Sequence, residues 1–284
     1  MPADGPDAKH RALQAVLAER GSVLVAFSGG ADSSLALRAA LDALGSERVL
    51  AVTVRSAMHP PGEAVEAAAL ARALGAEHLT IEATPLADPL VAANAPDRCY
   101  HCKRSLFASL LAIARERDLA AVADGTTADD LGVYRPGLRA CAELGILQPL
   151  RQAGLNKAEV RELSARLGLP TARKPASPCL ATRLPYGMPL TEARLQRVGA
   201  AEELIRGLGI ERLRVRLVDD HTARIEAPLD QLAELCQSDV RPRVVDGLRA
   251  LGLNYVTLDL AGLRSGSMDE MLPPQVIAEE DAQS

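Results

Sequence analysis

The sequence predicts an α/β fold in which a parallel sheet is covered by helices on both faces, followed by a smaller C-terminal α+β domain. Two observations support this prediction. In the first half of the chain, apolar runs of strand length alternate with stretches that carry apolar residues at helical spacing. After a proline-rich interruption, the pattern changes to strands of alternating polarity between short helices.

Each element of the first half follows from this periodicity. Strands are expected at 23–27, 49–54, 78–82 and 121–124, and helices at 33–44, 62–74 and 102–117, with one more helix before the first strand. Asn156 and Glu159 have the spacing of a capping box. The helix that they begin is expected to reach about residue 167, where Gly168 and Pro170 end it.

Residues 170–189, here called the cysteine loop, contain five prolines and no periodicity. Loops of this length in compact proteins are usually functional, and the loop is also the best domain boundary. Beyond it we expect helices at 191–208, 229–237 and 240–251 and strands at 212–218, 222–226 and 255–258. The predicted domains are therefore 1–175 and 176–272, with a disordered acidic tail at 273–284.

Composition excludes several classes of protein. A net charge of −5 disfavours a protein whose main task is binding a polyanion, so nucleic acid is not an expected partner. No run of about 18 apolar residues is present and the N-terminus lacks a signal-peptide core, which predicts a cytoplasmic protein that does not cross a membrane. The five cysteines, an odd number, point to metal binding or catalysis instead of disulfides.

A glycine turn, here called the phosphate loop (residues 28–33), joins the first strand to the next helix. Its sequence is Ser28-Gly29-Gly30-Ala31-Asp32-Ser33. Glycines allow backbone N–H groups to approach phosphate oxygens, and the helix directs its positive dipole end to the same place. Neither the Walker A pattern nor GxGxxG is present. A tight turn without a ligand is the alternative interpretation.

SGGxDS in this position resembles the motif of the PP-loop ATP pyrophosphatases. That resemblance implies ATP cleavage between the α and β phosphates, with adenylylation of a substrate. The later segment GTTADD, at residues 125–130, resembles a GTNxDD segment that lies beside the nucleotide in such enzymes. By analogy Gly125, Thr126 and Asp129 contact the nucleotide, and Asp32, Asp129 and Asp130 hold Mg²⁺. Turn chemistry alone would also favour Gly, Thr and Asp here.

The cysteines fall into two groups. Cys99 and Cys102 form a C-x₂-C pair just before a predicted helix, a spacing that lets two thiolates reach one metal or cluster. Cys179 lies in the cysteine loop between Lys174 and Arg183, whose charges would stabilise its thiolate. Cys141 and Cys236 lie in apolar helical patterns and are interpreted as small buried hydrophobic residues.

Five segments between about Gly21 and Met271 carry a more specific pattern: SGGADS, GTTADDLGVYRPGLRA, NKAEVRELSARLGLP, PASPCLATRLPYG and a later RVR-x₆-ARIE. Together they resemble the LarE family, the sulfur transferases that make the nickel-pincer cofactor of lactate racemase. This resemblance implies a PP-loop (adenine nucleotide α-hydrolase-like) fold and a small-molecule substrate, pyridinium-3,5-biscarboxylic acid mononucleotide. The enzyme would adenylylate a carboxylate, after which sulfur replaces AMP to give a thiocarboxylate.

The resemblance implies two sulfur sources. In one branch the cysteine matching Cys179 gives up its sulfur and becomes dehydroalanine. In the other, which this sequence resembles more closely, thiolates matching Cys99, Cys102 and Cys179 hold a [4Fe–4S] cluster whose open iron binds hydrosulfide. We predict the cluster here. Zinc on the pair, or reduced thiols with a sacrificial Cys179, is the rival.

Arginines suit a substrate that carries a phosphate and two carboxylates. Arg183, Arg214 and Arg216 lie in segments that match the family, and alternation places Arg214 and Arg216 on one face of a strand. A solvated surface role is the alternative for each. Glu203 is a candidate catalytic or Mg²⁺-binding carboxylate, although Glu202 is equally placed. The resemblance also suggests a homo-oligomer such as a hexamer.

Two other functions compete with this one. PP-loop tRNA thiolases combine a C-x₂-C pair with a distant cysteine, but the acidic charge and the lack of an evident tRNA-binding extension weigh against them. A non-enzymatic ATP-binding module with a structural zinc would leave the cysteine loop without a purpose.

Overall fold

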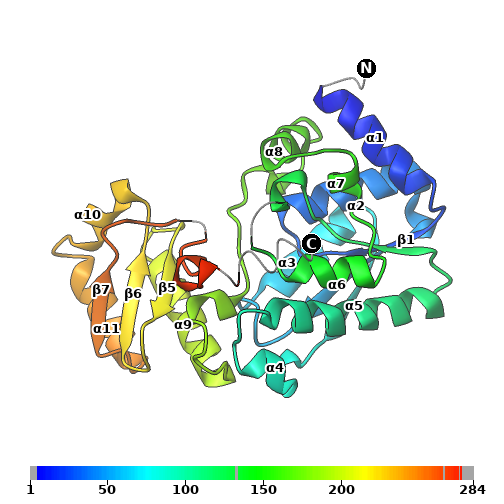
Figure 1. Ribbon diagram of the computed structural model, residues 1–284. Helices are drawn as coiled ribbons and strands as arrows, with labels where there is room; N and C mark the ends of the chain where they lie inside the picture. Colours follow the sequence, from blue (N-terminus) through cyan, green and yellow to red (C-terminus); the bar gives the residue numbers. More distant parts are fainter. Residues whose placement is uncertain (1–4, 132–133, 265, 275, 277–284) are drawn as a thin grey trace.

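The computed structural model describes residues 5–131, 134–264, 266–274 and 276. Two sheets form two lobes, with α9 (Glu192–Arg206) between them (Figure 1). Most of the predicted tail at 273–284 lies outside the described residues. The strands are β1 (Val23–Ala26), β2 (Val49–Arg55), β3 (Glu77–Glu82), β4 (Ala121–Ala123), β5 (Arg214–Leu217), β6 (Thr222–Glu226) and β7 (Tyr255–Leu258).

The first sheet is parallel and has the order β3-β2-β1-β4, which confirms the predicted parallel sheet. Val23 of β1 pairs with Val49 of β2 on one side and Ala121 of β4 on the other. A parallel bridge from Ala123 to Leu147 extends the sheet beyond β4. The carboxyl ends of β1 and β4 are therefore adjacent, which is where ligands bind in sheets of this kind.

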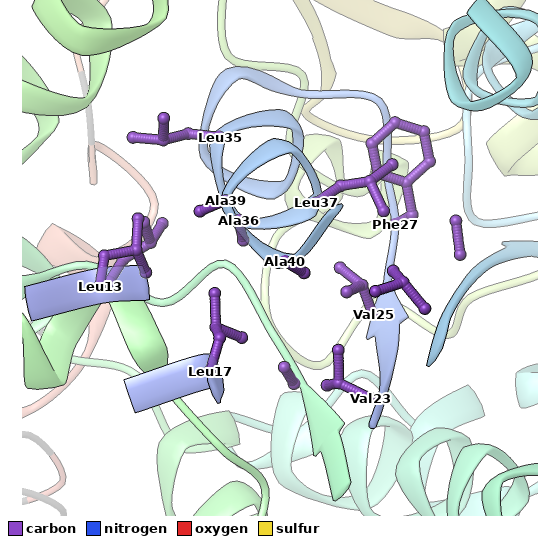
Figure 2. Packing of buried hydrophobic residues seen from close by; sticks show 14 of the residues in the cluster. Leu13, Leu17, Val23, Val25, Phe27, Leu35, Ala36, Leu37, Ala39 and Ala40 are labelled. Carbon is purple, nitrogen blue, oxygen red and sulfur yellow. The ribbon is translucent and has the colours of Figure 1, made fainter. Parts of the chain in front are cut away.

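Alternate residues of β1 serve two separate cores. Val23 and Val25 pack against α1 and α2, whereas Leu24 packs on the opposite face against α5. Figure 2 shows the first of these cores, where Leu13 and Leu17 of α1 face α2 and the strand. Both faces of the sheet are covered at its centre, so β1 and most of β2 read as continuous apolar runs, whereas the edge strand β3 is partly polar.

Helices surround this sheet, and three of them were not predicted. The short α4, α6 and α7 were missed because four to seven residues give too little periodicity to recognise. The helices are α1 (Pro6–Ala18), α2 (Ala31–Leu44), α3 (Glu63–Ala73), α4 (Pro89–Ala92), α5 (Arg98–Glu116), α6 (Gly137–Glu143), α7 (Pro149–Gln152), α8 (Lys157–Arg166), α9, α10 (Leu232–Leu235) and α11 (Arg241–Ala250). None of the helices in the described part of the chain combines the length and apolarity needed to span a bilayer.

The start of α5 corrects one prediction. The helix was expected from residue 102, yet it begins at Arg98, so Cys99 and Cys102 lie inside its first turns and not in a preceding turn. Residues three apart on a helix share a face. The C-x₂-C pair is therefore presented by helix geometry. The predicted capping box of α8 is confirmed, because Asn156 accepts from Glu159 N and Glu159 accepts from Asn156 N.

The second sheet has the order β5-β6-β7, with β5 antiparallel and β7 parallel to β6. It packs against α9 and α11 around a core of its own. Met58 and Val91 from the first half of the chain also belong to this core, as does the buried Leu180 of the cysteine loop. The predicted helix at 229–237 is a 3₁₀ turn (Leu229–Gln231) followed by α10.

Candidate functional site

The phosphate loop is held by its own side chains. Ser28 Oγ lies 3.0 Å from Ser33 Oγ and 3.3 Å from the N atom of Gly30. Gly29 has a φ of +69°, and a Cβ there would lie 3.0 Å from Ala67 Cβ. Only glycine fits this backbone conformation and this contact without strain. The loop thus brings the start of α2 to the carboxyl end of β1.

Gly125 brings the second predicted segment against the first. A Cβ on Gly125 would lie 3.0 Å from the N atom of Ser33, so the two backbones approach closely. Thr126 donates its Oγ1 proton to Asp124 at 2.7 Å, which fixes the turn after β4. Segments about 95 residues apart in sequence therefore form one edge, as the motif pattern indicated.

A cavity of about 600 Å³, the first cavity, opens at this edge. Ser28, Gly30, Asp32, Ser33, Gly125 and Thr126 all line it, and the other charged lining residues are Glu63, Lys103, Asp124, Asp130, Arg135, Lys157, Arg161 and Lys174. Sequence reasoning missed most of these cations. A signal was available, because three of the four lysines in the chain line this one cavity.

Two carboxylates in the first cavity interact with each other. Burial and the negative charge of Asp130 raise the pKa of Asp32. Burial also acts to raise the pKa of Asp130. The hydrogen bond that the backbone N–H of Thr127 donates to this carboxylate, together with the positive charges of Arg135 and Lys157, nevertheless holds the pKa of Asp130 below its usual range. A pair of crowded carboxylates facing a phosphate-binding turn is a donor set that suits Mg²⁺.

The placement of Asp129 differs from its predicted role. Its carboxylate accepts the backbone N–H of Lys157 at 2.7 Å and so caps the start of α8. It lines a neighbouring cavity and not the first one, where Asp130 lies instead. The reason is the 3₁₀ turn Ala128–Asp130, which directs these consecutive side chains to different sides.

Three thiols from two segments influence one another electrostatically, and the sequence neighbours of two of them, Lys103 and Pro178, line the first cavity. Burial raises the pKa of Cys102 to about 12, and the nearby thiols of Cys179 and Cys99 add to the rise. Burial likewise raises the pKa of Cys179 to about 11. Cys102 and Cys179 both pack against the core of the second sheet. Cys99 and Cys179 thus both act electrostatically on Cys102, while no three of these thiols form a site for a single metal ion within the described residues.

Thiolates are ligands of both zinc ions and iron–sulfur clusters, so the chemistry of the three cysteines suits either group. Within the described ranges, no group of three or more His, Cys, Asp or Glu side chains is arranged to hold a metal ion. Of the other two cysteines, Cys141 is fully buried, as predicted, and lies 3.7 Å from Asp124 Oδ2. The predicted burial of Cys236 is wrong, because this residue follows the short α10 and is exposed.

Arg183, which was predicted to bind substrate, is buried and hydrogen-bonded within the protein. Its Nε and Nη2 donate to both carboxylate oxygens of Glu202, at 2.7 and 3.1 Å, and Nη1 donates to the Pro178 carbonyl at 3.0 Å. The pair is buried, and it fixes the residue that precedes Cys179. Of the two glutamates considered, Glu202 is buried while Glu203 is exposed, so the structure gives no support to Glu203 as a site residue.

A second cavity of about 620 Å³ lies between the lobes and contains the other predicted arginines. Arg214 and Arg216 line it from the same face of β5, as expected from their alternation. Arg216 is buried and donates to Glu226, to the Thr182 carbonyl and to Ser267. Burial and the charges of Arg183 and Arg216 lower the pKa of Arg214.

The two cavities share part of their lining. Arg135, Lys157 and Pro178 line both of them. Pro178 directly precedes Cys179, so this cysteine follows a residue of the shared wall. An anionic ligand in the second cavity and a nucleotide in the first could therefore meet beside sulfur.

Comparisons with known proteins agree with this geometry. A family model described as NAD synthase matches residues 9–126, the part that contains the first sheet. The chain is 40% identical over 270 residues to pyridinium-3,5-bisthiocarboxylic acid mononucleotide synthase of Lactiplantibacillus plantarum, covering 95% of this chain and 97% of that protein. It is also 40% identical over 266 residues to the uncharacterized protein slr1717 of Synechocystis, covering 94% and 98%.

More distant similarity is confined to part of the chain. An NH(3)-dependent NAD(+) synthetase of Pyrobaculum aerophilum is 34% identical over 167 residues, which cover 56% of this chain and 61% of that protein. The similarity to the mononucleotide synthase, by contrast, extends through both lobes and includes the cysteine loop.

Proposed function

The chain belongs to the LarE family of PP-loop, ATP-dependent sulfurtransferases, and from this membership we propose that it makes a thiocarboxylate from a carboxylate of pyridinium-3,5-biscarboxylic acid mononucleotide. The relative's name specifies the bisthiocarboxylic acid mononucleotide as its product. The corresponding biscarboxylic acid is the chemical precursor of that product.

One observation supports this proposal most strongly. The first cavity, which has the phosphate loop, and the second cavity, which is rich in arginine, share a wall at Pro178, next to Cys179. A carboxylate held in the second cavity would face both the α-phosphate of ATP and a source of sulfur. Bringing these three reactants together is what this chemistry requires, because positioning removes much of the entropic barrier.

The first proposed step takes place in the first cavity. Asp32 and Asp130 hold Mg²⁺ on the phosphates, and Lys103, Lys157 and Lys174 offset their charge. A substrate carboxylate oxygen attacks the α-phosphorus, and the bond between the α-phosphorus and the bridging oxygen breaks to release pyrophosphate. This activation is necessary because a free carboxylate anion resists nucleophiles until one oxygen becomes a good leaving group.

The second proposed step transfers sulfur. A sulfur anion adds to the acyl carbon, and the bond to AMP then breaks to leave the thiocarboxylate. We propose that Cys99, Cys102 and Cys179 hold a [4Fe–4S] cluster. When bound, the cluster would supply an open iron site for hydrosulfide, so that sulfur need not come from the protein. Without it, Cys179 would be the donor and would end as dehydroalanine.

The test is a complete reaction under anaerobic conditions. The purified chain is incubated with ATP, Mg²⁺, hydrosulfide and the biscarboxylic acid mononucleotide. We expect AMP and pyrophosphate to form together, and the product to gain the mass difference between sulfur and oxygen. Asp32→Asn serves as the inactive control. Pyrophosphate release that does not depend on the mononucleotide would contradict the choice of substrate.

Assembly into a homo-oligomer is part of the proposal. Large apolar side chains are exposed on the second lobe, among them Leu229, Tyr255 and Leu260. Sedimentation of the intact chain would test it, and a monomer at micromolar concentration would exclude it.

A further inference from the structure

Arg98 occupies a costly position for a cation. It is the first residue of α5, and only 4% of its surface is exposed. The N-terminal end of a helix carries positive partial charge, which repels a guanidinium. Burial adds a desolvation cost that a charged group normally offsets with hydrogen bonds or an opposite charge. This placement therefore calls for a compensating partner.

No such partner exists in the described part of the protein. Among those residues the guanidinium of Arg98 makes no hydrogen bond and no ion pair, and its one polar contact is a stack on the ring of Tyr186, 4.7 Å from the ring centre. None of its nitrogens is sealed away from solvent without a partner, and the residue lines the second cavity. Its free donors therefore reach the cavity space.

Other cations around the same cavity are already engaged. Arg135 and Lys157 pair with Asp130 at 3.1 and 3.0 Å. Arg216 is bound to Glu226, and Arg214 donates to the Arg264 carbonyl at 3.3 Å. Arg98 thus has the most free hydrogen-bonding capacity among these cations in the described residues. Tyr186 itself is fixed by donating its hydroxyl proton to Asp269 at 2.8 Å, so the stacked guanidinium is held in place.

Among the cations that line the second cavity, Arg98 is the one adjacent in sequence to a predicted cluster cysteine. It directly precedes Cys99, and its charge acts on both Cys102 and Cys179. A planar group with five donors matches the two oxygens of a carboxylate, whereas a compact ammonium would not. A ligand at this point would therefore have a carboxylate oriented toward the thiols.

We propose that Arg98 binds the substrate carboxylate that undergoes sulfur transfer, and so selects a carboxylate over a neutral amide at this position. The inference rests on the function proposed above. After adenylylation, the oxygen that is not bonded to phosphorus stays beside Arg98. When the sulfur anion adds to the acyl carbon, the electron pair of the C=O bond moves to that oxygen. Arg98 stabilises the negative charge until AMP leaves and the double bond forms again.

The experiment measures binding by calorimetry and does not depend on turnover. Wild type and Arg98→Gln, matched for iron and acid-labile sulfide, are titrated with two ligands: the biscarboxylic acid mononucleotide, and nicotinamide mononucleotide, which has a neutral amide and no carboxylate. Arg98→Gln should weaken binding of the first ligand by about tenfold to a hundredfold. Binding of the second ligand should not change.

Arg104→Gln is the matched control, because Arg104 is on the same helix but exposed. Arg98→Lys, which keeps the charge but not the planar fork, should give an intermediate loss and replaces Arg98→Gln if that variant fails to fold. Equal weakening of both ligands, or wild-type affinity for the biscarboxylic acid in the variant, would overturn the role of Arg98. Failure of the wild-type protein to bind the biscarboxylic acid would instead overturn the proposed substrate, and this inference with it.

Discussion

Lys174 Nζ donates a hydrogen bond to the carbonyl oxygen of Gly29 at 3.3 Å, which joins the cysteine loop to the phosphate loop. The same amine lies 3.1 Å from a Glu66 oxygen. Residues 145 apart in sequence are thus in direct contact where nucleotide and sulfur chemistry are proposed to meet.

Replacing Lys174 tests this link. Lys174→Met should weaken ATP binding by about tenfold, since it removes a charge that lines the first cavity and loosens the loop. Glu66→Gln is the control, because the Glu66 side chain is largely exposed and such pairs contribute little. Calorimetric titration with ATP and Mg²⁺ measures both. Unchanged affinity in Lys174→Met would mean that the lysine does not contact the nucleotide.

The two glycines of the phosphate loop offer a matched pair. Gly29→Ala forces a side chain into a positive φ and against Ala67, and should lower the free energy of unfolding by about 1–2 kcal/mol or more. Gly30→Ala meets only Ser28 Oγ, at 3.4 Å, and should be tolerated far better. Urea denaturation would compare them. Equal costs would show that backbone strain at Gly29 is not the cause.

Asp32 gives a pH-dependent prediction. The pKa of Asp32 is raised in the folded protein, so the unfolded chain loses this proton at a lower pH than the folded chain. Stability therefore falls as pH rises from the unfolded pKa to the folded pKa, and it stays lower at higher pH. Asp32→Asn removes that loss. We expect a higher melting temperature than wild type at neutral pH without Mg²⁺, together with a drop in pyrophosphate release of about a hundredfold or more. A lower melting temperature would contradict the argument.

The cysteines separate the two sulfur sources. Cys99→Ser, Cys102→Ser and Cys179→Ser should each reduce iron and acid-labile sulfide in protein purified without oxygen, because each removes one ligand. Cys236→Ser should not, since Cys236 is exposed and lies in the second lobe. Mass spectrometry after turnover should find Cys179 intact. Iron-free wild-type protein in which Cys179 loses the mass of H₂S would establish the sacrificial route instead.

The buried Arg183–Glu202 pair should dominate the stability of the second lobe. Arg183→Leu leaves a buried carboxylate with fewer partners, and should cost about 3–5 kcal/mol in the free energy of unfolding. Arg206→Leu removes a cation from the same carboxylate, but its side chain is 36% exposed, so the cost should stay near 1 kcal/mol or below. Denaturant titrations followed by circular dichroism would compare them, and similar costs would argue against a role for burial.

Much of the fold could be predicted from the sequence because periodicity is strong in its longer elements. The bounds predicted for β6 and β7 match those observed, since alternating residues there face a core on one side. The start of α5 could not be predicted. Its first turns carry Tyr100 and His101 around the cysteines, and these polar residues interrupt the apolar pattern.

The site was predictable at the level of motifs but not of side-chain direction. The phosphate loop and the 125–130 segment do meet, because both follow parallel strands that are neighbours in the sheet. Asp130 lines the first cavity and Asp129 lines the second. This difference depends on the short 3₁₀ turn Ala128–Asp130, which no sequence pattern indicates. The burial of Arg183 depends on Glu202, and that pairing arises only when α9 packs against the cysteine loop.

The wall common to the two cavities also bears on the order in which ligands arrive. Arg135 and Lys157 each form an ion pair with Asp130, and each lines both the first and the second cavity. A polyphosphate bound in the first cavity would interact with the same two cations that attract an anion to the second cavity. A ligand in the first cavity therefore changes the affinity of the second cavity for its ligand, and the second ligand changes the affinity of the first cavity by the same factor. Two side chains, Arg135 and Lys157, set this thermodynamic linkage.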